Sequence, residues 1–250
     1  MPERTIRLVR EGFPDRMALD TAVSRVLLSE AAVPLGPETL RLSVPGRAVA
    51  FGKHDVVSAG FLQAVAATRA AGFQPFIRLA GGRAAVFHEQ SVAMSWTMPD
   101  EHPIEGIRAR FVAVAGAVTD ALVSLGIPAE IGALPGEYCP GDYSIHVGTG
   151  KVAGLGQRLS RSAAHIGGVV VVGNGAAVAD VLAPVYKALR LDWDPETAGA
   201  LTDTVAGIDP ETVIEAIVAQ VATDATIEEA RLAPETVAEA SALAGDFEPG

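Results

Sequence analysis

The sequence predicts an α+β fold in which one mainly antiparallel or mixed β-sheet is flanked by helices. Three observations support this class. Segments with helical spacing of apolar residues alternate with strand-like runs, turns containing Gly or Pro separate those runs, and no internal repeat or low-complexity linker divides the 250 residues. The hydrophobic content of 49% is enough for one sizeable core, so we expect a single domain over residues 1–250.

The first third of the chain shows this alternation clearly. Apolar residues recur at helical spacing through residues 17–33, and Pro34 and Pro37 end the expected helix. Two strand-like runs follow at residues 39–44 and 48–52. The Pro-Gly turn between them predicts a hairpin.

In the middle of the chain we expect a second hairpin, whose strands flank Gly81 and Gly82, because a Gly-Gly pair is a common hairpin signal. Helical or alternating patterns then continue to residue 125, where Gly126 ends a long helix. The elements predicted here are a helix over residues 60–72, strands at 76–79, 84–88 and 91–98, and a helix over 106–125.

In the last part of the chain, residues 143–172 predict three strands around two turns. After Asp180 the pattern is helical to the end, with acidic and alanine-rich stretches. Residues 240–250 are expected to fray.

Charge and composition exclude several functional classes. The net charge of -11 argues against nucleic acid as a partner, because that affinity depends on a basic surface. The charged residues 1–7 lead into no apolar segment, and no run approaches the 18 apolar residues of a membrane span, so we expect neither a secretory signal nor a membrane anchor. A single cysteine cannot form an internal disulfide, which fits the reducing cytoplasm.

Cys139 is a candidate nucleophile. Pro140 and Gly141 place it in a turn, Asp142 keeps that turn near water, and no apolar periodicity passes through it. Reactive cysteines are found on such partly exposed loops, since the nucleophile is the thiolate. The alternative is a free cysteine buried as a small hydrophobic side chain.

Lys151 follows a glycine turn and begins a strand rich in small residues, where bulk would block a narrow groove. An ammonium group there could lie on an acyl carbonyl, stabilise a developing oxyanion and lower the pKa of a thiol. The alternative is an exposed lysine, and we expect such a lysine to contribute little to stability.

Gly81 and Gly82 allow a ligand to approach the backbone closely, although an ordinary tight hairpin explains them equally well. The glycine spacing is not that of a Rossmann or P-loop motif, and a strand follows where those motifs need a helix. His88, at the end of that strand, is a weaker candidate for a polar contact in a pocket.

Several segments occur together in the order found in one protein family and cover most of the chain. They are Met17-Ala18-Leu19-Asp20, Thr39-Leu40-Arg41, residues 78–89, residues 137–144 and residues 151–158. By these segments the chain resembles the lipoate-protein ligase and octanoyltransferase family, which shares its fold with biotin-protein ligases. The Cys-Pro-Gly-Asp run at Cys139 looks most like the branch of cysteine-dependent octanoyl amidotransferases.

The resemblance implies a role for each matching residue. Cys139 would be the nucleophile that carries an octanoyl or lipoyl group, and Lys151 would contact the acyl carbonyl. The residues expected to bind the acyl chain are Arg78, Gly81, Gly82, His88, Gly154 and Gln157. If the two glycines face the acyl chain, Gly82→Val should impair transfer of octanoyl more than that of a shorter acyl group.

The resemblance also implies the partners, which would be lipoyl carrier domains: the glycine cleavage H protein and the E2 subunits of 2-oxoacid dehydrogenases. Transfer would need no cofactor, and the protein would be a cytoplasmic monomer. An ATP-dependent ligase, using ATP and Mg, is the alternative, and a catalytically idle acyl-binding or carrier-binding protein is a third.

Two differences from the family pattern favour transfer over ligation. The ligases usually have three glycines where this chain has Gly81-Gly82-Arg83, and a His-Asp pair where it has His88-Glu89. We also expect no separate C-terminal domain of the kind that many ligases carry.

Overall fold

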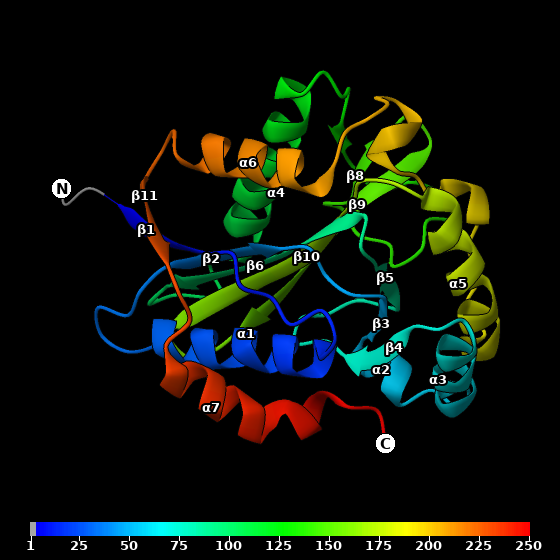
Figure 1. Ribbon diagram of the computed structural model, residues 1–250, viewed down its shortest axis with the longest axis horizontal. Coiled ribbons are helices and arrows are strands. Elements are labelled where there is room, and N and C mark those ends of the chain that lie inside the picture. The colour runs from blue at the N-terminus through cyan, green and yellow to red at the C-terminus, as the bar shows by residue number, and fades with distance from the viewer. Residues whose placement is uncertain (1–3) are drawn as a thin grey trace.

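The computed structural model describes residues 4–250 and contains two β-sheets surrounded by helices (Figure 1). The larger sheet has a parallel edge formed by three strands and is antiparallel elsewhere, so the predicted α+β class with a mixed sheet is confirmed. Its eight strands, in spatial order, are β11 (Thr226–Ala230), β1 (Thr5–Val9), β2 (Thr39–Ser43), β6 (Ser91–Pro99), β10 (Ala163–Val171), β9 (Gly150–Leu159), β8 (Ile145–Val147) and β7 (Glu130–Ile131).

The smaller sheet has three strands, with β3 (Ala48–Phe51) between β4 (Gln74–Ile77) and β5 (Ala85–Phe87). Strand β4 runs parallel to β3, and β5 runs antiparallel to it. Neither predicted hairpin forms. Strand β2 pairs with β6 while β3 belongs to the other sheet, and the two strands that flank the Gly-Gly pair are separated by β3.

Helices cover both faces of the larger sheet (Figure 1). On one face α1 (Met17–Ala31) contacts β6 and β10, and α7 (Pro234–Leu243) packs behind it. On the other face lie α4 (Ile107–Ser124) and α6 (Pro210–Val221). Beside the smaller sheet are α2 (Lys53–Val56), α3 (Phe61–Ala70) and α5 (Gly175–Leu189).

The main core lies between the larger sheet and helices α4 and α6. Both helices present apolar side chains at helical spacing to the central strands. The apolar periodicity of residues 106–125 predicted α4. Helix α6 begins where the Asp209 carboxylate accepts a 2.8 Å hydrogen bond from the Thr212 amide, with Pro210 in the first turn. Side chains of this core include Leu40, Leu42, Trp96, Val118, Leu122, Ile166, Ile214 and Ile217.

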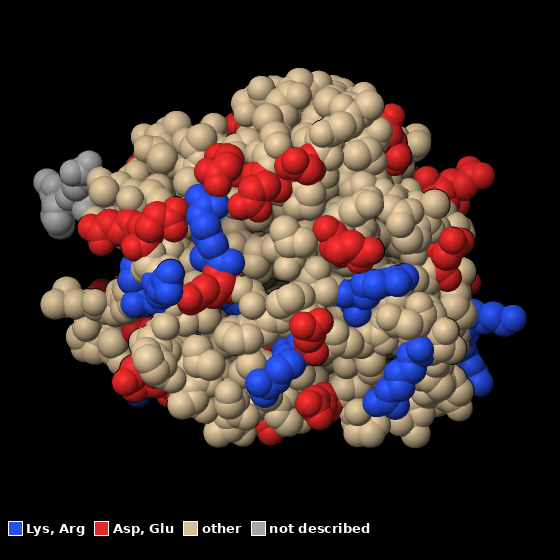
Figure 2. Space-filling model, viewed as in Figure 1, with Lys and Arg blue, Asp and Glu red and all other residues tan. Residues whose placement is uncertain are grey.

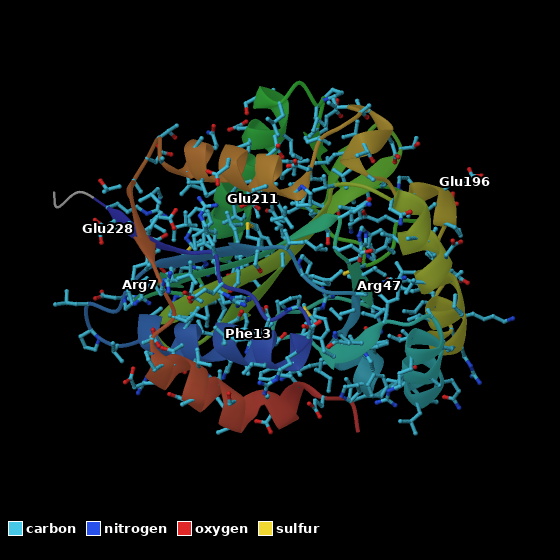
Figure 3. The ribbon with its side chains drawn as sticks, in the orientation of Figure 1. Arg7, Phe13, Arg47, Glu196, Glu211 and Glu228 are labelled. Carbon is cyan, nitrogen blue, oxygen red and sulfur yellow. The ribbon has the colours of Figure 1, made fainter. Side chains whose placement is uncertain are left out.

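Helix α1 has two functions in the fold. One side packs Leu19, Val23 and Val26 against α7, and Phe13 lies beside this cluster (Figure 3). The other side carries the smaller polar residues Thr21 and Ser24, which line a cavity instead of filling it. Helix α1 therefore packs against α7 on one side and lines the cavity on the other.

The C-terminal part differs from the prediction in two places. Residues 226–230 were expected to be helical but form β11, which pairs in parallel with β1. Residues 240–250 were expected to fray, yet α7 continues to Leu243 and a 3-10 helix follows at Ala244–Phe247. Ala240 and Ala244 are buried against α1, and this packing orders the segment.

The surface carries charges of both signs. Figure 2 shows acidic and basic residues interspersed over one face. Arg47, labelled in Figure 3, lies next to β3, and its guanidinium stacks 4.6 Å from the ring centroid of Phe73. In the described part of the chain no helix combines the length and apolar character needed to cross a membrane. Residues 1–3, which begin the charged N-terminal segment, lie outside the described residues.

Candidate active site

A cavity of about 580 Å³ lies between the larger sheet, helix α1 and two loops. The loops are residues 78–82, after β4, and residues 138–144, before β8. The cavity follows β9 from Gly154 to Leu159, about 16 Å at roughly 3.3 Å per residue. Its volume is typical of a small-molecule site. The larger apolar side chains in its wall include Met17, Phe76, Phe87, Met94, Leu155 and Phe111.

Cys139 lies in the cavity wall and is half-buried. Its backbone adopts the left-handed conformation, with φ of 43°. The Cys139 amide donates a 2.8 Å hydrogen bond to the Tyr186 hydroxyl, which in turn donates to the Ala84 carbonyl at 3.0 Å. Tyr186 of α5 thus connects the cysteine loop to the start of β5 and holds the thiol at the cavity.

Two donors converge on the thiol of Cys139. Arg78 Nη2 and the Arg83 amide nitrogen each lie 3.2 Å from Sγ. Gly82 makes this approach possible, because a Cβ there would lie 1.9 Å from Arg78 Nη2 and 2.8 Å from Sγ. Its φ of 116° is also one that L-residues rarely adopt. The glycine therefore makes room for the contact between arginine and thiol.

These donors shift the pKa of Cys139. Burial would raise the pKa of the thiol, but the positive charges of Arg78 and Lys151 lower it. The hydrogen bonds from Arg78 and the Arg83 amide act in the same direction, and the net result is a pKa below the usual value. Thiolates are both the nucleophilic and the better hydrogen-bonded form, so the site favours a reactive cysteine.

Lys151 is buried, so the alternative of an exposed lysine is wrong. Its Nζ donates to the carbonyls of Tyr138 at 3.0 Å and Cys139 at 2.8 Å, and it lies 3.2 Å from Glu137 Oε2. Gly154 leaves space for the stem, since a Cβ there would lie 3.3 Å from Lys151 Cε. Two of the three N–H donors of the ammonium group are thus bound to carbonyls of the cysteine loop.

The side chain of Glu137 is buried inside the cysteine loop and joins several of its residues. Its Oε1 accepts hydrogen bonds from the Gly141 amide at 3.0 Å and from Ser144 Oγ at 2.9 Å, while Oε2 faces Lys151. Burial lowers the pKa of Lys151, while the negative charges of Cys139 and Glu137 oppose that shift. Nothing in the local sequence distinguishes this glutamate from an exposed one, so its role was not predicted.

Five of the six residues predicted to bind the acyl chain line the cavity. They are Arg78, Gly81, Gly82, Gly154 and Gln157. The side-chain amide of Gln157 is bound to α4, because its Oε1 accepts from Arg110 and its Nε2 donates to the Ile107 carbonyl.

His88 does not line the cavity, contrary to expectation. It is buried near the turn that precedes β6, where its Nδ1 accepts a hydrogen bond from the Gln90 amide at 3.1 Å. A histidine on β10 lies in the cavity wall instead. Burial, together with the charge of Arg41, lowers the pKa of His165 to about 3, so this side chain is neutral near pH 7. Its Nδ1 lies 3.4 Å from Ser95 Oγ.

An ion pair between the buried Arg41 and the partly exposed Asp20 also lies in the cavity wall, and it was not predicted from the sequence. It joins β2 to α1, and Arg41 also donates to Ser24 Oγ at 3.2 Å. Within residues 4–250, no group of three or more His, Cys, Asp or Glu side chains is arranged to hold a metal ion.

The chain is similar in sequence to several known proteins. The chain is 30% identical over 213 residues to the octanoyltransferase LipM of Moorella thermoacetica, covering 76% of this chain and 74% of that one. It is 26% identical over 167 residues to the octanoyl-[GcvH]:protein N-octanoyltransferase of Geobacillus kaustophilus. The latter match spans 66% of this chain but only 59% of the relative's length.

Solved structures share the fold. A lipoate-protein ligase A bound with ATP superposes with a TM-score of 0.78 at 17% identity, covering 96% of this chain and 94% of that one. The bi-partite lipoate protein ligase of Thermoplasma acidophilum gives 0.75 at 16% identity, with coverage of 97% and 92%. The family model of the lipoyl protein ligase A/B catalytic domain matches residues 17–222, and the chain therefore belongs to that family.

Proposed function

We propose that this chain is an acyltransferase that moves an octanoyl or lipoyl group between lysines of lipoyl carrier domains, with the group held as a thioester on Cys139. The observation that carries the proposal is the environment of Sγ. The thiol lies in the wall of the cavity, and Arg78 Nη2 and the Arg83 amide each approach it to 3.2 Å. These contacts favour the thiolate, which is the nucleophile in covalent acyl transfer.

The cavity supports an acyl group as the substrate. Many of its lining side chains are apolar, among them Phe76, Phe87 and Met94, and it follows β9 for about 16 Å at roughly 3.3 Å per residue. The neutral His165 adds no charge to the wall near pH 7. Among the carriers, the glycine cleavage H protein is supported by the name of the Geobacillus kaustophilus relative, an octanoyl-[GcvH]:protein N-octanoyltransferase. E2 subunits are proposed as further carriers.

The reaction proceeds in two balanced steps. Sγ attacks the carbonyl carbon of the donor's acyl-lysine, the S–C bond forms, the C–N bond breaks, and the lysine leaves as an amine with a proton taken from water. The acceptor amine then attacks the thioester, the new C–N bond forms, the C–S bond breaks, the thiolate of Cys139 is released, and the proton that the amine loses returns to water. Neither step consumes ATP, so the proposed transfer needs no nucleotide and no Mg.

The test is the intact mass of the protein after incubation with an octanoylated H protein in the absence of ATP. We expect one octanoyl adduct, located on Cys139 by peptide mapping, and no adduct on Cys139→Ser. Appearance of octanoyl-carrier only when ATP, Mg and free octanoate are supplied would contradict transfer and indicate ligation. Absence of both activities, with the carrier still bound, would indicate a binding protein.

A further inference from the structure

We propose that the far end of the acyl cavity is a polar subsite around His165 and Ser95, which binds sulfur near the end of the acyl chain better than it binds hydrocarbon. The inference rests on the proposed function and deepens it, because it makes lipoyl rather than octanoyl the preferred group. It depends on where the acyl chain starts, how far it reaches and which atoms it meets there.

The thiol of Cys139 lies at the β9 side of the cavity. A Cβ at Gly82 would lie 2.8 Å from Sγ, and a Cβ at Gly156 of β9 would lie 2.7 Å from the carbonyl oxygen of the adjacent Gly81. Lys151, near the start of β9, donates to the Cys139 carbonyl at 2.8 Å. An acyl group on Cys139 therefore enters the cavity over β9.

From β9 the floor of the cavity crosses the larger sheet beneath helix α1. Four residues that lie in register on β9, β10, β6 and β2 line it: Gly156, Gly167, Ser95 and Arg41. Neighbouring strands are about 4.8 Å apart, so β6 lies about 10 Å from β9. A saturated chain advances about 1.2 Å per bond, as an extended backbone does, which puts its eighth carbon about 9 Å from the first. The end of an octanoyl or lipoyl chain therefore lies over β6, at the depth of Ser95.

His165 brings an unpaired polar atom to this depth. Its side chain on β10 is buried, with 3% exposure, and its Nδ1 lies 3.4 Å from Ser95 Oγ. Its Nε2 lies over the floor, because a Cβ at Gly167 would lie 2.8 Å from this nitrogen. No described residue forms a hydrogen bond with Nε2, so this nitrogen is free to bind a group that enters the cavity.

The surrounding polar groups leave this end of the cavity without net charge. Arg41 on β2 pairs with Asp20 of α1, and its Nη1 donates to Ser24 Oγ at 3.2 Å. Burial and the charge of Arg41 lower the pKa of His165 to about 3, so the imidazole is neutral near pH 7. The subsite therefore suits an uncharged polar or polarisable group.

A lipoyl group carries such atoms at this depth. Its two ring sulfurs are bonded to the sixth and eighth carbons, where octanoyl has only hydrogen. The Ser95 hydroxyl can donate to Nδ1 of His165, which leaves the ring proton on Nε2 as a donor. Sulfur is a weak acceptor and packs favourably against aromatic rings, whereas a hydrocarbon end leaves the buried Nε2 without water and without a partner. Lipoyl should therefore be bound better than a hydrocarbon chain of the same shape.

The experiment compares two small thioesters that differ only in sulfur, using the full-length protein. One carries lipoyl, and the other carries cyclopentylpentanoyl, in which CH₂ groups replace both ring sulfurs. Intact mass follows the adduct on Cys139 and separates acylation from disulfide exchange with the lipoyl ring. At limiting thioester we expect the wild type to be acylated about tenfold faster by lipoyl, the effect of one buried polar group left unpaired by the analogue.

The decisive variant is His165→Leu, in which both acyl groups meet a hydrocarbon wall, and we expect the preference for lipoyl to disappear. The matched control is His88→Leu, because His88 has the same 3% exposure but does not line the cavity, and its preference should equal that of the wild type. Equal rates for the two thioesters in the wild type, a preference that survives in His165→Leu, or one that is lost in His88→Leu would each overturn the inference. Wild-type protein that is acylated by neither thioester would instead reject the proposed function.

A second variant, Ser95→Ala, covers the case in which His165→Leu does not fold. It removes one hydroxyl from the floor and with it the partner of Nδ1, and it leaves no charge unpaired. We expect the ratio of the lipoyl rate to the cyclopentylpentanoyl rate to fall. A ratio equal to that of the wild type would contradict the polar subsite.

Discussion

Lys151 and Glu137 form an ion pair that is almost completely removed from solvent, with Nζ 3.2 Å from Oε2 and side-chain exposures of 1% and 0%. The pair lies directly behind Cys139, whose carbonyl is one of the acceptors of Lys151. Because each charge is buried, removing one partner leaves the other without compensation. The stability of the protein and the geometry of the cysteine loop therefore depend on the same two side chains.

Removal of Lys151 should destabilise the fold. We expect Lys151→Met to lower the free energy of unfolding by about 3–5 kcal/mol, the usual cost of breaking a buried ion pair. The double variant with Glu137→Gln should lose less than the single variant, since no buried charge is left unpaired. Urea unfolding of the wild type, both single variants and the double variant measures this. An unchanged free energy of unfolding in Lys151→Met would contradict the buried ion pair and support the alternative of an exposed lysine.

The pH dependence of stability should change when the charge of Glu137 is removed. The pKa of Lys151 is lower in the folded state than the ordinary 10.5, and Glu137 limits that shift. The folded state thus binds fewer protons than the unfolded state between the two pKa values, so the free energy of unfolding rises with pH in this window. Glu137→Gln should lower the pKa of Lys151 further and extend the rise to lower pH. Exposed Glu130→Gln is the control, and parallel curves for both variants would contradict the prediction.

Loss of the arginine charge should raise the pKa of Cys139. Arg78 lowers this pKa both by its charge and by a hydrogen bond. The rate of alkylation of Arg78→Gln should therefore reach its midpoint at higher pH than that of the wild type. Arg47→Gln removes a charge from an exposed arginine outside the cavity and should leave the midpoint in place. A common shift in both variants would indicate a general effect of net charge.

Substitution by alanine should affect transfer activity differently at Gly81 and at Gly82. At Gly82 the new Cβ would lie 1.9 Å from Arg78 Nη2, whereas at Gly81 no atom lies within 4 Å. We expect Gly82→Ala to lose transfer of octanoyl and of shorter acyl groups alike, because it disrupts the contact between Arg78 and Cys139. Gly81→Ala should keep most activity. Selective loss of the longer acyl group in Gly82→Ala would instead place that glycine against the acyl chain.

Elements with strong local periodicity were predictable from the sequence. Helices α1 and α4 and strand β6 lie within two residues of the predicted bounds, because their apolar spacing reflects a face that is buried along the whole element. Strands β1 and β11 escaped prediction. Each has only five residues. Strand β11 (Thr226–Ala230) carries two glutamates and no apolar alternation, so its extended conformation depends on pairing with β1.

The pairing of strands was not predictable. The turn at Pro45 and Gly46 signals that the chain changes direction, but it contains no information about which sheet each strand joins. A Cβ at Gly46 would lie 2.0 Å from the Pro14 carbonyl oxygen, so a distant segment explains this glycine better than a hairpin does. The same limit affected the Gly-Gly segment, whose flanking strands pair with β3 and not with one another.

The candidate site was predictable where a backbone requirement marks it. The turn around Cys139 and the glycine at position 82 are visible in the sequence because they reflect unusual backbone conformations. Burial of charge leaves no such local mark. Glu137 and Lys151 are ordinary surface residue types, and only their packing in three dimensions pairs them. His88 follows β5 outside the cavity, whereas His165 on β10 lines it, and no local feature of the sequence distinguishes the two histidines.

The edge of the larger sheet has a consequence for the order of folding. Strand β1 pairs with β11, and their register places Thr5 opposite Thr226. During synthesis β1 can join β2 early, but its other side stays open until residues 226–230 have left the ribosome. An open strand edge is a template for pairing with another chain, and loops of this length close slowly. We expect nascent chains that stall before β11 to associate with one another, and completion of this edge to be the last step in assembly of the sheet.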